Sequence, residues 1–148
     1  MSTRSAPRSI CVALALVATA AVCLTELRAD SPQEEWKAPP RAARRKNPIP
    51  ADAQSVAAGR TVYTSQCLSC HGPAGHGDGT AAKDLNPKPR DLSVPAIASQ
   101  SDGALFWKIT EGRKPMPSFE KLIGEDQRWQ VINYVRTLGS GSNQAAAK

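Results

Sequence analysis

Apolar side chains recur at helical spacing in three stretches of the chain, whereas no stretch alternates between apolar and polar residues as a strand does. We expect helices over residues 52–65, 101–111 and 125–138. Asp52 and Ser101 stand at the N-cap positions of the first two, where their side chains accept hydrogen bonds from backbone N–H groups. The third has Glu125 and Asp126 in its first turn and is followed by Gly139, where we expect it to end. The pattern predicts an all-α domain.

Two of these helices carry a signal for close contact. Val56, Gly59 and Tyr63 fall on one face of the first helix. A glycine inside a helix costs roughly 1 kcal/mol against alanine, and the close approach of a second helix would justify that cost. The expected buried face of the third helix consists of Trp129, Ile132, Val135 and Leu138. We expect Tyr134 of this helix to meet the region of Gly59.

The N-terminal segment has the composition of an export signal. Arg4 and Arg8 precede an uncharged apolar run from Ile10 to Leu24. As a helix, these 15 residues would span about 22 Å, against roughly 30 Å of membrane hydrocarbon. We therefore expect residues 1–29 to be a cleaved signal peptide, with an uncleaved membrane anchor as the alternative. In both cases the rest of the chain is exported.

The leader leaves more than one processing site open. Ala29 and Ala20 each stand at a compatible cleavage site. Lipidation of Cys23 is a further alternative, which Val22 disfavours because lipidated cysteines follow smaller residues. We expect Cys11 and Cys23 to be small apolar residues of the leader.

Proline and basic residues dominate residues 30–50, which contain five prolines and show no apolar periodicity. We expect a charged linker or extended arm there. Arg44, Arg45 and Lys46 are expected to form a solvated patch, a contact with a membrane surface or a partner being the less favoured interpretation. Residues 140–148 are expected to form a disordered tail.

The net charge of +6 is distributed unevenly along the chain. Residues 1–50 carry +4 and Lys148 carries one more, so that residues 51–140 carry only +1. This foldable segment has no basic stripe with interleaved aromatic residues, which argues against a nucleic-acid-binding domain.

The two cysteines beyond the leader stand in the motif Cys67-Leu68-Ser69-Cys70-His71. This C-x-x-C-H spacing is typical of covalent haem c attachment. Two thiols one helical turn apart add across the two vinyl groups of one haem, and the adjacent histidine becomes the proximal iron ligand. A zinc site needs a second pair of ligands and a thioredoxin-like redox pair needs a βαβ context, both of which are missing here. We therefore expect one haem c, attached through Cys67 and Cys70 and ligated by His71.

A second axial ligand is expected downstream, and Met116 in the segment Lys114-Pro115-Met116-Pro117 is the candidate. Met1 is the only other methionine of the chain. The flanking prolines restrict the backbone, which suits a soft ligand held at a fixed distance. The alternatives are a methionine that fills a core gap and His76 as the ligand. His76 follows His71 by five residues, which keeps it on the wrong side of the haem.

Residues 51–139 resemble a monohaem bacterial cytochrome c domain of the His/Met-ligated family. The resemblance rests on Cys67-x-x-Cys70-His71-Gly72, Gly75-x-Gly77-Asp78-Gly79, Leu85-x-Pro87-x-Pro89-x-Asp91-Leu92, Pro115-Met116-Pro117 and a last helix with Trp129 and Tyr134. It implies a small cytochrome c fold, in which three or more helices and a glycine/proline-rich loop wrap one covalently attached haem. In this family a proline carbonyl accepts the Nδ1–H of the proximal histidine, which implies Pro87 or Pro89 as that acceptor. It also implies that the first and last helices cross at Gly59 and Tyr134.

Iron ligated by both His71 and Met116 has no open coordination position, so we expect one-electron transfer and no enzymatic activity. The first hypothesis is an exported electron carrier between respiratory redox partners, in the periplasm or tethered at the extracytoplasmic face of the cytoplasmic membrane. The alternative is a cytochrome c subunit held within a larger membrane oxidoreductase, where Trp36 and the basic arm would dock on a partner. A haem enzyme such as a peroxidase needs an open iron. Neither a nucleic acid nor a small-molecule substrate is expected.

Overall fold

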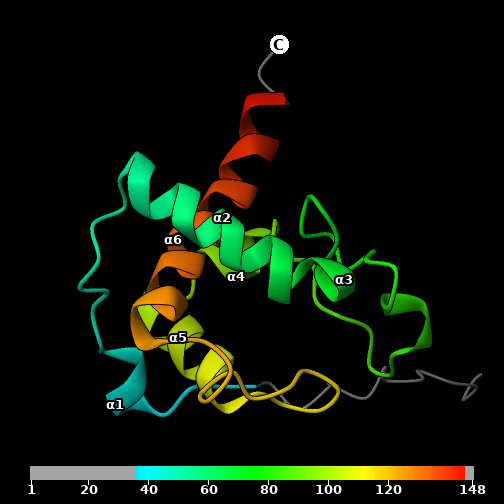
Figure 1. Cartoon of the computed structure of the whole chain (residues 1–148), viewed down its shortest axis with the longest axis horizontal. Coiled ribbons are helices and arrows are strands. Elements are labelled where there is room, and N and C mark those ends of the chain that lie inside the picture. The colour runs from blue at the N-terminus through cyan, green and yellow to red at the C-terminus, as the bar shows by residue number, and fades with distance from the viewer. Residues whose placement is uncertain (1–35, 146–148) are drawn as a thin grey trace, which may run out of the picture. The chain divides into compact units, whose positions relative to one another are not determined.

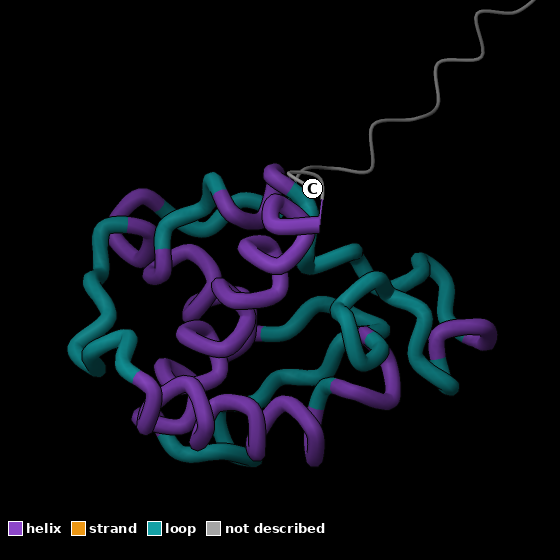
Figure 2. Tube along the Cα trace, turned by 90° about the horizontal axis from the view of Figure 1, so that it is seen from above, coloured by secondary structure: helices purple, strands orange, loops and turns teal. Residues whose placement is uncertain are grey.

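The structure, a computed structural model, describes residues 36–145, with side chains up to Gly139. The regular secondary structure in this range is helical (Figures 1 and 2). Its elements are α1 (Pro40–Ala43), α2 (Ala53–Gln66), α3 (Leu68–His71), the short 3₁₀ helix η1 (Ala82–Asp84), α4 (Pro95–Ala98), α5 (Asp102–Glu111) and α6 (Glu125–Ala145). The prediction of an all-α fold is confirmed.

The predicted leader lies outside the described residues, and so do Cys11 and Cys23. The same holds for residues 30–35 of the predicted arm and residues 146–148 of the predicted tail. Between residues 36 and 145, no helix combines the length and the apolar character needed to cross a membrane.

Capping side chains explain where α2 and α5 begin. Oδ1 of Asp52 accepts a hydrogen bond from the backbone N–H of Ser55 at 2.7 Å, and Oγ of Ser101 accepts one from Ala104 at 3.2 Å. α5 ends at Gly112, whose φ of 68° lies in the left-handed region. The first two predicted helices are therefore confirmed, with ends that differ by no more than about one residue.

The third predicted helix, α6, runs further than expected. It continues past Gly139 to Ala145, through residues that the sequence assigned to a disordered tail, so the prediction that it ends at Gly139 was wrong. Gly139 does not end the helix, and its role is in packing. A Cβ atom there would lie 3.3 Å from the carbonyl oxygen of Ser93. The small residue lets the helix lie close to the segment before α4.

α2 and α6 cross with their backbones in contact, and Gly59 makes this approach feasible (Figure 1). A Cβ atom on Gly59 would lie 2.0 Å from the carbonyl oxygen of Gln130 and 3.1 Å from Cβ of Tyr134. Beside this contact the rings of Tyr63 and Tyr134 pack with their centroids 5.1 Å apart. The predicted meeting of Gly59 with Tyr134 is confirmed.

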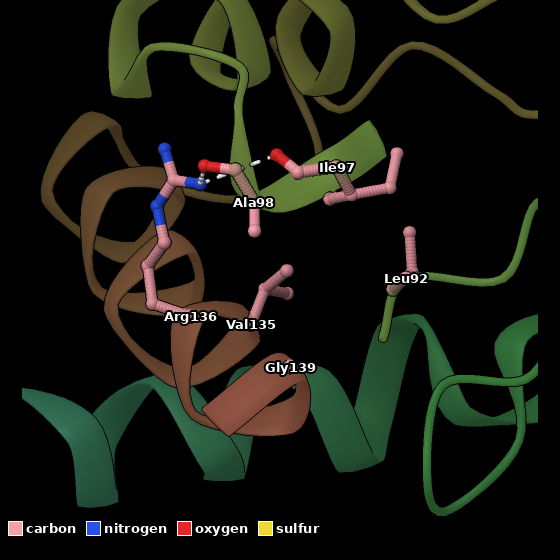
Figure 3. A pocket seen from close by; sticks show the side chains of 6 residues that line it. All are labelled: Leu92, Ile97, Ala98, Val135, Arg136 and Gly139. Carbon is pink, nitrogen blue, oxygen red and sulfur yellow. Dashed lines mark hydrogen bonds between the residues drawn. The ribbon is translucent and has the colours of Figure 1, made fainter. Parts of the chain in front are cut away.

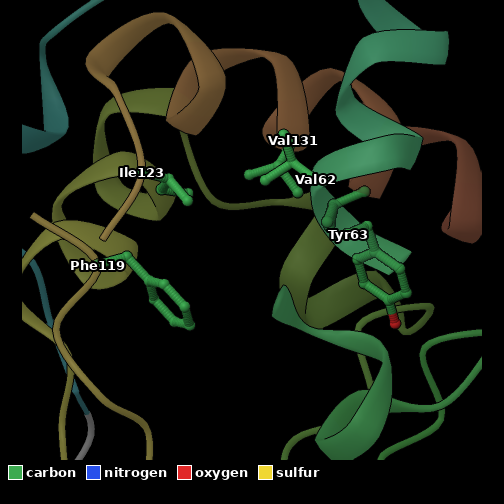
Figure 4. Close-up of a cluster of buried hydrophobic side chains, with 6 residues drawn as sticks. Val62, Tyr63, Phe119, Ile123 and Val131 are labelled. Atoms are coloured by element: carbon green, nitrogen blue, oxygen red, sulfur yellow. The ribbon is translucent and has the colours of Figure 1, made fainter. Parts of the chain in front are cut away.

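Two clusters of buried apolar side chains share α6. The α2–α6 cluster consists of Val62, Tyr63, Phe119, Ile123, Val131 and Val135 (Figure 4). The α5–α6 cluster consists of Leu105, Phe106, Trp129 and Ile132. Within it the rings of Phe106 and Trp129 stack with centroids 3.9 Å apart. Because α6 contributes residues to both clusters, it joins them into one core.

Residues 36–50, which fall in the predicted arm, pack against α5 and α6. The backbone around α1 lies on Gly103, where a Cβ atom would be 2.3 Å from the carbonyl oxygen of Ala42. Oγ of Ser101 donates to the carbonyl of Ala43 at 2.6 Å, and Ile49 packs against the α5–α6 cluster. The proline-rich composition thus belongs to an ordered arm over this range.

The guanidinium of Arg45 covers the α5–α6 cluster. Its Cζ lies 4.6 Å from the ring centroid of Phe106 and 5.2 Å from that of Trp129, and the group also pairs with Glu125 at the start of α6. Arg44 and Lys46 are exposed, in agreement with the predicted solvated patch. For Arg45 that prediction was incomplete, because its guanidinium contacts the rings of Phe106 and Trp129 and pairs with the carboxylate of Glu125.

A buried amide connects the arm with α2 and α6. Asn133 of α6 is 4% exposed, and its Oδ1 accepts a hydrogen bond from Nδ2 of Asn47 at 2.8 Å. Nδ2 of Asn133 lies within 3.0 to 3.3 Å of the Ile49 and Pro50 carbonyls and of Oγ of Ser55. Loss of this side chain leaves several buried polar groups without a partner.

Replacing Gly59 with alanine is expected to lower the free energy of unfolding by about 3 kcal/mol, because the new methyl group meets backbone atoms of Gln130 that cannot move aside. Denaturant unfolding of the purified protein measures this. Gly124→Ala is the matched control, since a Cβ atom there meets only the Gln127 side chain, at 3.4 Å. Equal unfolding free energies for the two variants would contradict the tight crossing.

Replacing Asn133 with alanine is expected to lower the free energy of unfolding by about 2 kcal/mol and to release the arm, because the buried groups that it pairs lose their partner. Thermal denaturation gives the first effect, and faster trypsin cleavage after Arg44 and Lys46 gives the second. Thr137→Ala, at an exposed position of the same helix, should change neither. An arm that resists trypsin equally in both variants would show that Asn133 does not hold it.

Candidate functional site

The C-x-x-C-H motif forms one helical turn at the end of α2. Cys67 is at once the C-cap of α2 and the N-cap of α3, and the backbone N–H groups of Cys70 and His71 lie 3.2 and 2.9 Å from its carbonyl oxygen. Both thiols are free and half-buried. The fold therefore presents two thiols and an imidazole within a single turn, with no disulfide between the cysteines.

The environment of Cys67 keeps its sulfur protonated. Burial, and secondly the neighbouring Cys70, raises the pKa of Cys67 to about 12. Within the described part of the chain, no group of three or more His, Cys, Asp or Glu side chains is arranged to hold a metal ion. Two sulfurs and one imidazole fit the attachment and ligation of a haem.

His71 is held through its Nδ1 atom, which lies 3.1 Å from the carbonyl oxygen of Arg90. Since a carbonyl only accepts, Nδ1 carries the proton and Nε2 is left with a free lone pair. Burial lowers the pKa of His71, and the bond to Arg90 acts in the opposite direction with a smaller effect. The side chain is thus a neutral imidazole in one tautomer, the form that ligates iron.

Neither Pro87 nor Pro89, the acceptors implied by the resemblance, provides the carbonyl that faces His71. The carbonyl of Pro89 lies against Gly77, where a Cβ atom would be 2.3 Å from the oxygen. Gly77 also has a φ of 74°, which only glycine adopts readily. Because the Pro89 carbonyl is turned toward this glycine, the next carbonyl along the chain, that of Arg90, reaches the imidazole.

The loop after His71 is tied to α2 and to the segment of Arg90. Oη of Tyr63 donates to the carbonyl of Gly72 at 2.7 Å, and burial raises the pKa of Tyr63, so that its hydroxyl remains a donor. The N–H of Leu92 donates to the carbonyl of Gly75 at 2.6 Å. These two bonds hold the loop after His71 against α2 and against the segment that carries Arg90, so the imidazole stays next to the Arg90 carbonyl.

His76 belongs to the support of this loop. Its Nδ1 lies 3.3 Å from Oδ2 of Asp91 and 3.2 Å from Oγ of Ser93. Oδ1 of Asp91 accepts from the N–H and the hydroxyl of Ser93 at 2.8 and 2.6 Å, and these bonds lower the pKa of Asp91. The engagement of His76 with a half-exposed carboxylate favours Met116 over His76 as the axial ligand.

Arg136 of α6 binds α4, which follows the segment of Arg90 and Asp91 along the chain (Figure 3). Its Nη1 donates to the Ile97 and Ala98 carbonyls of α4 at 3.3 and 3.0 Å, and the guanidinium pairs with Asp102. The cavity beside it has a volume of about 20 Å³, which has room for one water molecule and not for a cofactor. Its lining residues are Leu92, Ile97, Ala98, Val135, Arg136 and Gly139.

Met116 lies on a loop that folds back onto α5. Its N–H donates to the carbonyl of Arg113 at 2.9 Å and its carbonyl accepts the N–H of Arg113 at 3.0 Å, while the N–H of Phe119 donates to the carbonyl of Ile109. Met116 is half-buried and packs against the α2–α6 cluster, and Cys67 and Leu68 pack against the same cluster. One apolar cluster thus contacts both the attachment turn and the candidate distal ligand.

Arg128 fixes the segment that follows Met116. The residue is 6% exposed, and its Nη1 donates to the carbonyls of Phe119, Glu120 and Ile123 at 3.3, 2.9 and 2.8 Å. These bonds hold Phe119 and Ile123 in the α2–α6 cluster, next to which Met116 packs. The loop that carries Met116 is therefore bound to α5 through Ile109 and to α6 through Arg128.

Sequence reasoning missed Arg90, the hydroxyl of Tyr63 and Arg128 as parts of this site. Arg90 acts through its backbone carbonyl, which residue type does not reveal. Arg128 and Tyr63 bind carbonyls of loops whose course the sequence does not predict. A signal did exist for Asp91, because Asp-x-Ser is typical of a turn in which the carboxylate accepts the N–H two residues further on.

This chain is similar to known cytochrome c proteins. The family model described as "Cytochrome C oxidase, cbb3-type, subunit III" matches residues 54–135. Cytochrome c6 of Rippkaea orientalis (strain PCC 8801 / RF-1) is 37% identical over 86 residues, which are 58% of this chain and 73% of that protein. The cbb3-type cytochrome c oxidase subunit CcoP of Azospirillum sp. (strain B510) is 32% identical over 92 residues, which are 62% of this chain and 31% of CcoP.

A solved structure has the same fold over much of this chain. A chain of the Kuenenia stuttgartiensis reducing HAO-like protein complex Kustc0457/Kustc0458 superposes with a TM-score of 0.56 and 30% identity, over 62% of this chain and 46% of that chain. The family-model match spans both the attachment turn and Met116. The predicted family and fold are thus confirmed: this chain belongs to the family described as cbb3-type cytochrome c oxidase subunit III and is an electron-transfer cytochrome c with a small all-α fold.

Proposed function

We propose that this cytochrome is an exported one-electron carrier that holds a single haem c and passes electrons between redox proteins of a respiratory chain. The observation that carries the proposal is the geometry of the attachment turn. Nδ1 of His71 is held by the Arg90 carbonyl, while Cys67 and Cys70 offer free thiols in the same turn. When bound there, haem c supplies a one-electron Fe(II)/Fe(III) couple.

On this proposal the attachment turn positions the cofactor. Cys67 and Cys70 would hold the haem through two thioether bonds, and Nε2 of His71 would be the nitrogen that ligates the iron. The Arg90 carbonyl accepts the Nδ1–H, which keeps the imidazole in one tautomer and increases its strength as a ligand. The bonds from Tyr63 to Gly72 and from Leu92 to Gly75 keep this carbonyl and the imidazole at a constant separation.

On this proposal the thioether of Met116 would be the second protein ligand of the iron. Its loop is paired with Arg113 and anchored by Arg128, so the thioether is presented from a segment with little freedom to move. With His71 and Met116 both as ligands, no position would be left for a substrate or O₂, and these residues would have only to hold the cofactor in place during electron transfer. The export signal expected in residues 1–29 supports a location of the carrier in the periplasm or at the outer face of the cytoplasmic membrane.

A second candidate is a cytochrome subunit held within a larger oxidoreductase. Two comparisons favour it, since CcoP is named as a subunit of an oxidase and the Kuenenia stuttgartiensis chain is part of a complex. This chain spans less than half of either protein. Salt washing of isolated membranes followed by detergent extraction separates the candidates. A carrier, whether released by salt or tethered, is isolated alone, whereas a subunit co-purifies with its oxidoreductase.

Mass spectrometry of the protein exported by its host is expected to show the mass of one covalently attached haem and to identify the N-terminal residue. Cys67→Ser together with Cys70→Ser should remove the added mass, because no thiol then remains in the exported domain. Ser69→Ala, within the same turn, is the matched control and should keep it. An exported protein with no added mass would overturn the proposal.

Met116→His is expected to lower the reduction potential by on the order of 0.2 V, because an imidazole stabilises Fe(III) more than a thioether does. It should also abolish the weak red-region absorption band that a sulfur–iron bond gives the ferric protein. Redox titration followed by absorption spectroscopy measures both changes. His76→Ala tests the alternative ligand and should keep the band, with a much smaller change in potential, since His76 only supports the loop after His71. If His76→Ala shifts the potential and Met116→His does not, the second ligand is His76.

A further inference from the structure

The described part of the arm carries most of the net positive charge of residues 36–140. Residues 36–50 contain five basic residues and no acidic one, whereas residues 51–140 carry a net charge of only +1. The basic residues are Lys37, Arg41, Arg44, Arg45 and Lys46. Because the rest of the domain is nearly neutral, this arm is the part of the described chain that attracts anions.

Three of these arginines meet at one open hollow of about 540 Å³ on the arm. Its lining residues are Pro39, Arg41, Ala42, Arg44 and Arg45. Arg41 and Arg44 are exposed, and no acidic side chain of the described residues pairs with either. Arg45 shares its charge with Glu125 and with the aromatic faces beneath it. The hollow therefore presents at least two guanidinium groups to an anion.

The fold holds this hollow in place before any ligand binds. The backbone of α1 rests on Gly103, and Oγ of Ser101 donates to the carbonyl of Ala43 in the arm. Further along the arm, Nδ2 of Asn47 donates to Oδ1 of Asn133 in α6. A charged linker without such contacts would have to be ordered on binding, which weakens association. The arm keeps its charges on an ordered backbone.

The hollow also lies well away from the attachment turn. In Figure 1, α1 and α3 stand at opposite sides of the domain. A partner bound at α1 therefore leaves the turn of Cys67 and Cys70 accessible to redox proteins. Binding at the hollow is compatible with electron transfer and does not compete with it.

We propose that this hollow binds the anionic headgroups of a phospholipid membrane on the exported side. Guanidinium groups bind phosphate through paired N–H donors, and the open shape of the hollow suits a surface. Trp36, where the described arm begins, favours a membrane over an acidic protein. Its half-buried ring packs against Trp107 with centroids 6.2 Å apart. Tryptophan rings beside basic side chains are typical of the headgroup layer.

Vesicle binding of the full, haem-loaded chain as exported tests this proposal. The measured quantity is the ratio of binding to vesicles of phosphatidylcholine with phosphatidylglycerol over binding to phosphatidylcholine alone, at increasing salt. A retained apolar anchor contributes equally to both and cancels. Arg41→Gln with Arg44→Gln is expected to lower the ratio about 25-fold at low salt, since each basic residue near an anionic surface contributes roughly a factor of five.

Lys83→Gln with Lys88→Gln is the matched control, because it removes the same charge from two exposed lysines of the segment after the attachment turn. Arg41→Lys with Arg44→Lys keeps both positive charges and should retain most of the binding. This result would show that the glutamine variant loses binding through its lost charge and not through misfolding. An equal loss in the Lys83 and Lys88 control, or no preference for anionic vesicles, would overturn the proposal. So would unchanged vesicle binding together with loss of a co-purifying acidic protein in the Arg41 and Arg44 variant.

Discussion

The backbone contact between α2 and α6 at Gly59 is the constraint on which the other elements depend. Because Gly59 has no side chain, the two backbones touch at this point, and the end of α2 is fixed relative to α6. The turn that begins at Cys67 follows directly and is fixed in the same way. Tyr63, on α2, then reaches the Gly72 carbonyl and packs on Tyr134 of α6. A larger side chain at position 59 would separate the helices and displace the attachment turn together with its loop.

α6 in turn holds three irregular segments through side chains with several N–H donors. Arg128 binds the loop after Met116, Asn133 binds the arm, and Arg136 binds the end of α4. Each uses carbonyl groups that irregular segments leave without a partner. A domain of this size has a small core and few apolar contacts to place its loops. Buried polar side chains on one helix supply the missing restraints, so that the segments carrying Arg90 and Met116 keep a defined position.

The arm and the attachment turn differ in the side chains around them, which are basic at the arm and apolar at the turn. The arm precedes the region that the family model matches, yet it covers the α5–α6 cluster inside that region. Its charges lie over aromatic rings and on the surface around α1, while the attachment turn adjoins the apolar α2–α6 cluster. A cytochrome organised in this way can use one end for attachment to a surface and the other for electron exchange.

The sequence by itself determined what depends on neighbouring residues. Cys67, Cys70 and His71 lie within one turn, so their spacing reveals their chemistry, and Asp52, Ser101 and the helical periodicity placed α2 and α5. Only the tertiary structure decided that Arg90 and neither proline faces His71, that α6 continues past Gly139, and that the arm is packed. These features depend on partners 19 to 86 residues apart and on the direction of backbone carbonyls. Residue type does not encode that direction, because every peptide unit carries the same carbonyl group.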